Sequence, residues 1–454
     1  MKVKAQKLAK FFALCRLSVL FAINYGQTDA AFIRSNTYAA ISGRTETYMT
    51  EIALLGFGVV GGGVARVLTD NCELIEKRAK EKISIKYILD LRDFPDSPFG
   101  DRIVHDYDVI LNDPSVKIVA EMMGGSHPAY EYTKAALLAG KSVVTSNKEC
   151  VAKFGDELLS IAKENGVRYL FEASVGGGIP IIRPMINDLA PNNIISVSGI
   201  LNGTTNYILT EMTANNSEFA DVLADAQAKG YAERNPAADV EGLDAARKIV
   251  ILTALATGIR LDSDGIYCEG ITEIDPSDIA LAAELGCKIK LIARYEQING
   301  KLLAMVSPRL VPDTNPLYGV DDVFNGILVS TDMLGDVMFY GRGAGMLPTA
   351  GAVVADIIDI VTHKTVGEGV KPLEWRIAAE CDSVCFDEYR CDRVFTVSGA
   401  ASDIATVEKF FGNVEVLSEK DGKMSFTVKN MSEAEAKNAV QSSPLAIVNK
   451  FRML

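Results

Sequence analysis

A glycine-rich turn between a strand and a helix is the feature that most constrains this chain. Glu51–Leu55 has the apolar pattern of a short buried strand, and Gly62 opens a helix soon after it. The turn between them is Gly56, Phe57, Gly58, Val59, Val60 and Gly61. Strand, G-x-G-x-x-G and helix in this order predict a dinucleotide-binding unit, in which the helix N-terminus faces the pyrophosphate. The alternative is a structural glycine turn.

Strands and helices alternate after this turn, which predicts an α/β fold with a parallel, doubly wound sheet of the Rossmann type. A second strand is expected over 83–89, and Asp90 and Arg92 follow it. An acid in this place binds a ribose 2′-hydroxyl, whereas an arginine accepts a 2′-phosphate, so NAD and NADP both stay open. Further strands are expected over 118–122, 142–146 and 167–174, with helices over 130–139 and 156–165.

Three polar segments follow the ends of these strands, where ligands bind in doubly wound sheets. They span 123–129, 145–148 and 172–180. Lys148 is a functional candidate because of its place at a strand end. His127 precedes Pro128 at a helix start, which is more typical of a structural residue.

A polar loop carrying Glu233 and Asp239 runs into a helix that is expected to begin near Asp244 and to end at Gly258. Asp244 and Lys248 are spaced i, i+4, so they share one helix face. A lysine entering an apolar run is costly to bury, and its pKa is easily shifted. The simpler interpretation is a solvent-facing ion pair, and the other is a functional lysine.

The middle of the chain mixes strands and helices. A strand is expected over 193–201, and a polar loop over 202–206 precedes a helix over 207–212. A further strand and helix pattern runs through 289–295, 302–310 and 323–328. A glycine-rich segment at 339–345 leads into a helix over 349–360 that would return to the first domain. We therefore expect a Rossmann domain over 49–180, completed by about 335–365, and an α+β domain over 181–334.

Residues 385–454 are expected to form a separate small module. The pattern predicts a strand over 393–398, a helix over 402–411, a hairpin across Asp421 and Gly422, and a last helix opened by a capping box at Ser432. This β-α-β-β-α order resembles the ACT-type regulatory domain. The usual glycine-containing effector loop is not obvious, so an L-threonine effector and a packing or dimerisation role both stay open.

The charge balance limits the partners of this chain. The formal net charge is −13, and an acidic body without a basic stripe argues against nucleic acid. Eight cysteines are scattered without zinc-like spacing, so we expect reduced thiols and a cytoplasmic location. Residues 1–48 look like an unstructured extension, with a targeting peptide as the alternative. No other stretch has the length and low charge of a membrane span.

Six motifs in order resemble those of homoserine dehydrogenase, over about residues 49–365. They are 56–61, 146–149, 172–180, 202–206, 230–248 and 341–349. The resemblance implies a reversible, NADP- or NAD-dependent reduction of L-aspartate 4-semialdehyde to L-homoserine, in threonine, methionine and isoleucine biosynthesis. It also implies a homodimer or homotetramer. The residues before Met49 are too few for a kinase domain. The alternatives are another amino-acid-linked oxidoreductase of this architecture and a non-catalytic amino-acid sensor.

The resemblance further implies roles for single residues of the substrate site. Lys248 matches the lysine that gives a proton to the aldehyde oxygen, and Asp244 matches the acid beside it. Lys148 matches a second lysine where the cofactor meets the substrate. The implied substrate-binding residues are Glu233, Asp239, Gly203 and Thr204. Asn235 stands where many relatives have aspartate, which puts only the substrate affinity in doubt.

Cofactor and cation sites are implied in the same way. The residues toward the dinucleotide are Gly56, Phe57, Gly58, Val59, Val60, Gly61, Arg92, Lys148, Gly341 and Gly343. Glu172, Val175, Gly177 and Ile179 match a site for a monovalent cation, usually sodium, that is built mainly from backbone carbonyls.

Overall fold

A six-stranded parallel sheet forms the first part of the structure. The computed structural model describes residues 49–363, 373–399, 404–420 and 422–454, and Met49–Leu454 form one unit of the chain. The expectations for residues 1–48, 402–403 and Asp421 lie outside the described residues. The strand order is β3-β2-β1-β4-β5-β6, and each pair is parallel. This order confirms the predicted doubly wound sheet.

Four strands of this sheet agree with the predicted ones, the last one differs in length, and β3 was not predicted. Their bounds are β1 (Met49–Leu55), β2 (Lys82–Leu89), β3 (Ile103–Val104), β4 (Val116–Glu121), β5 (Ser142–Thr145) and β6 (Tyr169–Leu170). The strand expected over 167–174 is therefore too long. Glu172–Ser174 instead forms a short 3-10 helix, and the Glu172 N–H donates to the Asp356 side chain, 2.9 Å away, rather than to a neighbouring strand.

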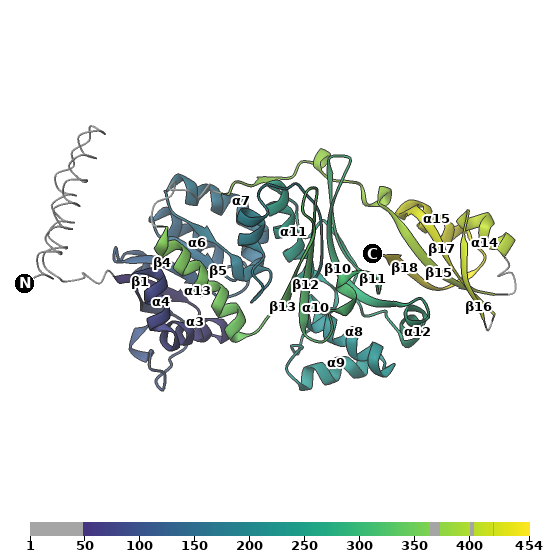
Figure 1. Cartoon of the computed structure of the whole chain (residues 1–454). Coiled ribbons are helices and arrows are strands. Elements are labelled where there is room, and N and C mark those ends of the chain that lie inside the picture. The colour runs from purple at the N-terminus through teal and green to yellow at the C-terminus, as the bar shows by residue number, and fades with distance from the viewer. Residues whose placement is uncertain (1–48, 364–372, 400–403, 421) are drawn as a thin grey trace, which may run out of the picture. The chain divides into compact units, whose positions relative to one another are not determined.

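Helices cover both faces of the parallel sheet because successive strand residues point to opposite sides. Ile52 and Leu54 belong to a core cluster with α13, whereas Ala53 and Leu55 belong to a second cluster with α6 and α7. The helices are α3 (Val59–Asp70), α4 (Cys72–Ala79), α5 (Tyr107–Leu111), α6 (Ala129–Leu138), α7 (Lys148–Glu164) and α13 (Met346–Thr362). α13 returns from late in the chain to lie beside α3 (Figure 1).

A second, mixed sheet follows, in the order β13-β12-β7-β10-β11-β18-β15-β17-β16, with β9 paired to β11. Its strands before the C-terminal region are β7 (Ile194–Ile200), β9 (Tyr267–Cys268), β10 (Cys287–Ile298), β11 (Lys301–Pro312), β12 (Phe324–Thr331) and β13 (Gly335–Arg342). The helices of this part are α8 (Gly203–Asn215), α9 (Phe219–Ala228), α10 (Ala237–Val240), α11 (Leu243–Thr257) and α12 (Pro276–Glu284). A small parallel pair joins β8 (Ile259–Arg260) to β14 (Arg376–Ile377).

Two helices begin earlier than the sequence pattern predicts. α7 begins at Lys148 rather than Asp156, and α8 begins at Gly203 rather than Tyr207. The residue before each is an asparagine, and its side chain accepts a backbone hydrogen bond in the first turn of the helix. Asparagine is among the most favourable N-cap residues, so polar segments that look like loops are helix starts here.

The C-terminal region continues the second sheet instead of standing apart from it. Its elements are β15 (Arg390–Ser398), α14 (Ile404–Phe411), β16 (Glu415–Lys420), β17 (Lys423–Ser432), α15 (Glu433–Ser442) and β18 (Ala446–Met453). The predicted capping box at Ser432 is present. The sequence pattern missed β18, which pairs with β15 and also runs parallel to β11. Through that pairing the hydrogen-bonded sheet runs from the middle of the chain into the C-terminal region.

Three further findings concern the described residues alone. None of their helices combines the length and apolar character that crossing a membrane requires. The seven cysteines among them, from Cys72 to Cys391, form no disulfide. No group of histidine, cysteine, aspartate and glutamate side chains in this part of the chain has the arrangement of a metal site.

Candidate active site

A cavity of about 640 Å³ lies where the carboxyl ends of the parallel strands meet the starts of α8 and α11. It extends from Val59 and Val60 in the glycine-rich turn to Lys248 on α11. The other lining residues are Ser146, Lys148, Ala173, Ser174, Val175, Gly177, Asn202, Gly203, Thr204, Gly230, Tyr231, Glu233, Asp239, Asp244, Val323, Asn325, Arg342, Gly343, Ala344, Gly345 and Thr349. Of the predicted residues, the cavity thus brings together Val59, Val60, Lys148 and Gly343 from the nucleotide set with the substrate set, whereas Gly56, Phe57, Gly58, Gly61 and Arg92 are not in its lining.

The predicted helix carrying Asp244 and Lys248 is α11, which ends at Gly258 in the left-handed conformation, φ 73°. Asp244 is 4% exposed and Lys248 is 7% exposed. The interpretation of these residues as a solvent-facing ion pair is therefore wrong. Spacing along the helix sets which residues share a face, but only packing determines whether that face is buried.

One carboxylate serves two lysines at the inner end of the cavity. Lys248 Nζ donates to Asp244 Oδ2, 2.7 Å away, and to the Leu201 carbonyl, 2.6 Å away. Lys148 Nζ lies 2.5 Å from the other oxygen, Asp244 Oδ1. Lys148 is the first residue of α7, and its side chain is 39% exposed. The three charged groups form a compact acid–base cluster.

Burial and charge act in opposite directions on these groups. Burial lowers the pKa of Lys248 below its ordinary value, and the nearby charge of Asp244 offsets only part of that effect. Burial alone would raise the pKa of Asp244, but the charges of Lys248 and Lys148 outweigh it and hold that pKa below its usual range. For Lys148, burial opposes protonation, yet the Asp244 carboxylate leaves the pKa of Lys148 raised. Lys248 is thus the lysine whose proton is released more easily.

Asn202 joins two carboxylates of the cavity, and sequence reasoning did not single it out. Its Nδ2 donates to Asp239 Oδ1, 2.8 Å away, and to Asp244 Oδ2, 3.0 Å away. Its Oδ1 caps α8 by accepting from the Thr205 N–H at 2.9 Å. The signal available in the sequence was an asparagine directly before a helix start, which is the N-cap pattern.

The remaining substrate-side candidates line the same cavity. Burial raises the pKa of Asp239, although the Asn202 hydrogen bond acts against that rise. Glu233 is exposed at the mouth of the cavity. Gly203 and Thr204 form the first turn of α8, and Thr204 Oγ1 donates to the Tyr231 carbonyl at 2.7 Å.

The glycine-rich turn has the form that a dinucleotide requires. Gly56 has a φ of +92°, and a Cβ on Gly61 would lie 2.0 Å from the Gly56 carbonyl oxygen, so neither position accommodates a larger residue. α3 begins at Val59 after Gly58, which provides no side-chain cap. Val59 and Val60 of this helix start line the cavity, and the N–H groups of an uncapped helix start suit a pyrophosphate.

Asp90 and Arg92 lie together beside this turn. One Asp90 carboxylate oxygen, Oδ2, accepts from the Phe57 N–H at 2.8 Å, and both of its oxygens accept from Arg92 at 3.0 Å. Hydrogen bonding from Arg92 lowers the pKa of Asp90 to about 2. The Arg92 side chain is 64% exposed and stacks over the Phe94 ring. The arginine is thus held in place and still reachable from solvent.

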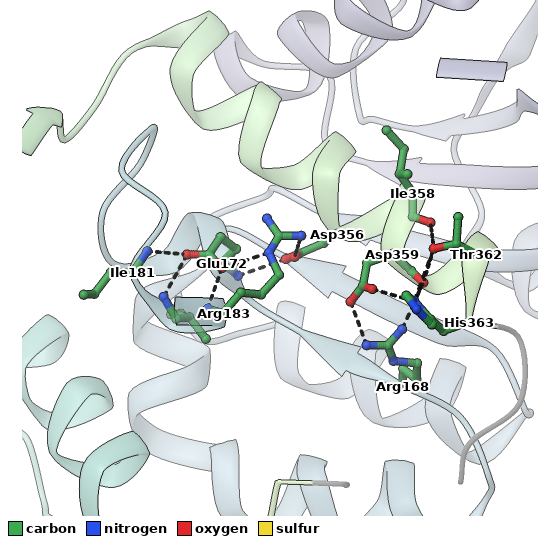
Figure 2. A network of polar contacts seen from close by, with 10 residues as sticks. Arg168, Glu172, Ile181, Arg183, Asp356, Ile358, Asp359, Thr362 and His363 are labelled. Carbon is green, nitrogen blue, oxygen red and sulfur yellow. Dashed lines mark hydrogen bonds and ion pairs between the residues drawn. The ribbon is translucent and has the colours of Figure 1, made fainter. Parts of the chain in front are cut away.

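Glu172, one of the predicted cation residues, belongs to a polar network that Figure 2 shows. The Glu172 carboxylate accepts from the backbone N–H groups of Ile181, Ile182 and Arg183, at 2.7 to 2.9 Å. The Arg183 guanidinium lies 3.3 Å from Glu172 and 3.3 Å from Asp356. Burial raises the pKa of Asp356 to about 7. With three N–H donors and the Arg183 guanidinium around it, the Glu172 carboxylate is already fully engaged.

Backbone oxygens remain for a cation in this region. Among the described residues, the carbonyls of Val175, Gly177 and Ile179 accept no hydrogen bond. Gly177 has a φ of +55°, and a Cβ on it would lie 2.2 Å from the Gly343 carbonyl oxygen.

The two glycines predicted toward the dinucleotide late in the chain differ in their positions. Gly343 lines the cavity, but Gly341 lies in β13 and is absent from the cavity lining.

A nucleotide-binding sheet whose cavity ends at a buried lysine–carboxylate cluster defines a Rossmann-type dehydrogenase. Family models described as "Homoserine dehydrogenase" and "Homoserine dehydrogenase, NAD binding domain" match residues 180–358 and 56–172. The chain belongs to the homoserine dehydrogenase family. It is an oxidoreductase that binds NAD(P) and interconverts L-homoserine and L-aspartate 4-semialdehyde.

Named relatives agree with this assignment. A homoserine dehydrogenase of Neisseria gonorrhoeae is 44% identical over 315 residues, which is 68% of this chain and 72% of the relative. A solved homoserine dehydrogenase from Thiobacillus denitrificans superposes with a TM-score of 0.82 at 32% identity, over 90% of this chain and 99% of that one. A hyperthermophilic archaeal homoserine dehydrogenase in complex with NADPH superposes with a TM-score of 0.60 at 27% identity, over 72% of this chain and 100% of that one.

Proposed function

We propose that Lys248, Asp244 and Lys148 are the catalytic residues with which this chain carries out the homoserine dehydrogenase reaction. The observation that carries the proposal is the buried Asp244 carboxylate, which contacts both lysines at the inner end of a cavity that begins at the dinucleotide turn. Two cations around one carboxylate are costly to bury, so their presence in a cavity is more consistent with chemistry than with stability.

In this proposal Lys248 transfers the proton. The bound nicotinamide dinucleotide supplies or accepts the hydride. Reduction of an aldehyde develops negative charge on its oxygen, so an ammonium placed there stabilises the transition state and then gives up its proton. In the direction of homoserine oxidation, the neutral amine takes the proton of the substrate hydroxyl. The lowered pKa of Lys248 favours that neutral form.

Asp244 and Lys148 orient the reacting groups in this scheme. Asp244 Oδ1 contacts the Lys148 ammonium, and its second lone pair offers an acceptor for the substrate hydroxyl. Asp244 Oδ2 holds the Lys248 ammonium group and keeps it directed into the cavity. Lys148, with a raised pKa, stays protonated and balances the carboxylate charge where the two halves of the cavity meet.

The acidic side of the cavity suits a zwitterionic amino acid. We assign the substrate ammonium to Glu233 and Asp239, since carboxylates are its strongest partners. Gly203 and Thr204 lie at the start of α8, where free N–H groups and the helix dipole favour the substrate carboxylate.

The cofactor assignment rests on the turn from Gly56 to Gly61 and on Arg92. An exposed arginine held by Asp90 beside the turn can accept a 2′-phosphate, and the archaeal relative binds NADPH. We therefore propose NADP as a cofactor, with the 2′-phosphate at Arg92, and NAD as a second one.

A monovalent cation, by preference sodium, is proposed on the carbonyls of Val175, Gly177 and Ile179. These oxygens lack protein donors, and hard cations prefer oxygen ligands. Glu172 contributes there through its backbone carbonyl and its negative charge, because its carboxylate oxygens are occupied by N–H groups.

The broader organisation is part of the same proposal. We propose a Rossmann domain over 49–180, completed by 335–365, a substrate and dimerisation domain over 181–334, and an ACT-like region over 385–454. A homodimer or homotetramer, a cytoplasmic location and a possible L-threonine effector complete it. The β-α-β-β-α-β order of the C-terminal elements supports the ACT-like assignment.

The test is homoserine-dependent reduction of NAD and of NADP by the wild type and by Lys248→Ala. Loss of a proton donor and acceptor costs about 10²–10⁴-fold in rate, so we expect a loss of that size in kcat. Lys437→Ala, on the exposed face of α15, is the matched control and keeps full activity. A Lys248→Ala variant as active as the wild type would contradict the role of Lys248 in proton transfer.

A further inference from the structure

The amide oxygen of Asn325 is buried without a hydrogen-bond partner in the wall of the active-site cavity. Asn325 is 1% exposed, and its Oδ1 accepts no hydrogen bond from the residues that the structure describes. Asn325 lies near the start of β12, an otherwise mostly apolar buried strand. Buried polar atoms in native proteins are almost always paired. An unpaired acceptor lining a binding cavity therefore points to a ligand that supplies a hydrogen-bond donor.

The side chain of Asn325 is packed directly against Gly343. A Cβ on Gly343 would lie 2.0 Å from Asn325 Nδ2, so glycine is needed there to leave room for the amide. Three residues after Gly343, α13 begins at Met346. Met346 packs closely against Gly63 of α3, since a Cβ on Gly63 would lie 2.9 Å from it. Asn325 thus contacts the segment 343–346, which in turn packs against α3, the helix after the glycine-rich turn.

The other side of Asn325 faces the substrate half of the cavity. Its Oδ1 lies 3.7 Å from where a Cβ on Gly203 would be, at the first turn of α8. The amide therefore lies between the nucleotide side and the substrate side. A dinucleotide whose pyrophosphate lies at Val59 has to place its nicotinamide ring between these two sides to reach Lys248.

Two N–H donors could reach this oxygen during the reaction, the substrate ammonium and the nicotinamide carboxamide. The ammonium is better served by the carboxylates of Glu233 and Asp239, because charge-assisted hydrogen bonds are the stronger ones. A primary carboxamide donates and accepts at once, as the asparagine side chain does, so the two groups are complementary.

We propose that Asn325 binds the carboxamide of the nicotinamide ring, with its Oδ1 accepting a carboxamide N–H. The proposal rests on the NAD(P)-dependent function described above and adds a cofactor-binding residue outside the glycine-rich turn. A ring held by its carboxamide has one face fixed toward Lys248 and the substrate. Asn325 therefore selects the ring orientation from which hydride transfer is productive.

The experiment measures nucleotide binding in the absence of substrate, by calorimetry on the full chain. The probes are NAD, the 3-acetylpyridine analogue of NAD, which has no carboxamide N–H, and ADP-ribose, which has no ring. Wild type is expected to bind NAD more tightly than the acetylpyridine analogue. In Asn325→Ala the Kd for NAD should rise about tenfold, while the Kd values for the analogue and for ADP-ribose stay unchanged.

Two further variants keep the test interpretable. Asn325→Asp retains an acceptor of the same shape, so it should still prefer NAD over the acetylpyridine analogue even if Asn325→Ala fails to fold. Asn449→Ala removes another buried amide, which donates to Asp278 on α12, and should leave the Kd for NAD unchanged.

Several outcomes would overturn the proposal. An unchanged Kd for NAD in Asn325→Ala, or an equal rise for NAD and ADP-ribose, would mean that the amide does not bind the ring. A higher KM for homoserine with an unchanged Kd for NAD would assign Asn325 to the substrate instead. If the wild type bound no nucleotide at all, the cofactor assignment itself would fail, which is a distinguishable result.

Discussion

Lys148 Nζ lies 2.5 Å from Asp244 Oδ1, although the two residues come from opposite halves of the fold. Lys148 begins α7 on the parallel sheet, and Asp244 lies in the first turn of α11, which packs against α7. The helix carrying Asp244 and Lys248 thus receives its third charged group from the nucleotide half. The reacting groups are complete only when the two halves are packed together.

The first prediction concerns the pH dependence of homoserine oxidation. The neutral form of Lys248 accepts the hydroxyl proton, so kcat should rise with pH through the pKa of that lysine. Burial lowers this pKa, so the midpoint of the rise should lie below the ordinary lysine value of 10.5. Stopped-flow or steady-state measurement of kcat between pH 6 and about 10 gives the midpoint. A rise in the direction of aldehyde reduction over the same range would contradict this assignment.

The second prediction is that two variants shift this midpoint in opposite directions. The charge of Lys148 lowers the pKa of Lys248, so Lys148→Ala should move the midpoint to higher pH. The charge of Asp244 raises the same pKa, so Asp244→Asn should move it to lower pH. Both variants should also lose activity. Equal shifts of the same sign would show that a different group titrates.

The third prediction assigns Asn202 to substrate binding. Asn202→Ala removes the donor shared by Asp239 and Asp244, so we expect the KM for homoserine to rise about tenfold. Loss of the N-cap of α8 should also cost about 1 kcal/mol of unfolding free energy. Asp275→Ala removes the N-cap of α12 and serves as the control, with a similar loss of stability and an unchanged KM. A rise in KM for both variants would indicate a general effect of instability.

The fourth prediction concerns the choice of cofactor. Arg92→Ala removes the exposed guanidinium beside the dinucleotide turn, so NADPH binding should weaken by a factor of about ten or more. NADH has no 2′-phosphate, and its Kd should change little. Fluorescence titration with both nucleotides measures the ratio. If both affinities fall equally, Arg92 supports the turn rather than reading the phosphate.

The fifth prediction concerns the last strand. Arg452 on β18 donates to Glu433 at 2.7 Å and to Glu269 at 2.6 Å, and its side chain is 6% exposed. Arg452→Met leaves Glu433 buried with one partner fewer and should cost about 3 kcal/mol of unfolding free energy. Ile271, close to Glu269 in the chain, donates to the Val240 carbonyl of α10, the helix that contains Asp239. A displacement of this segment should therefore raise the KM for homoserine as well.

Denaturant unfolding of Arg452→Met beside Lys429→Met tests this prediction. Lys429 pairs with Asp392 at the surface, where the lysine side chain is 67% exposed, so its replacement should change the stability little. Equal stability of the two variants would show that the Arg452 side chain does not hold the segment around Glu269 in place.

Several parts of the fold could be predicted from the sequence because local patterns determine them. The strand, glycine turn and helix from Met49 to Asp70 follow from the apolar run and from glycines without which the turn could not close. The helix from Leu243 to Thr257 follows from its apolar content and its glycine at the end. The alternation that follows the first turn indicated the parallel sheet.

Other parts could not be predicted because capping, strand pairing and contacts from distant segments decide between the structures that the local pattern allows. The segments at Lys148 and Gly203 look like loops, but an asparagine caps a helix in each case. β18 has a weak strand pattern and is defined by its two neighbours, β15 and β11. The strand expected at 167–174 ends early because Asp356 of α13 binds the Glu172 N–H.

The sequence by itself determined the fold class, the family and the identity of the candidate catalytic residues, since these are written in short motifs and in their order. Only the tertiary structure decided that Asp244 and Lys248 are buried, that Lys148 joins them, and that Asn202 and Asn325 share their cavity. The reason is physical. Burial, and the pKa changes and unpaired atoms that follow from it, arise where distant segments pack together.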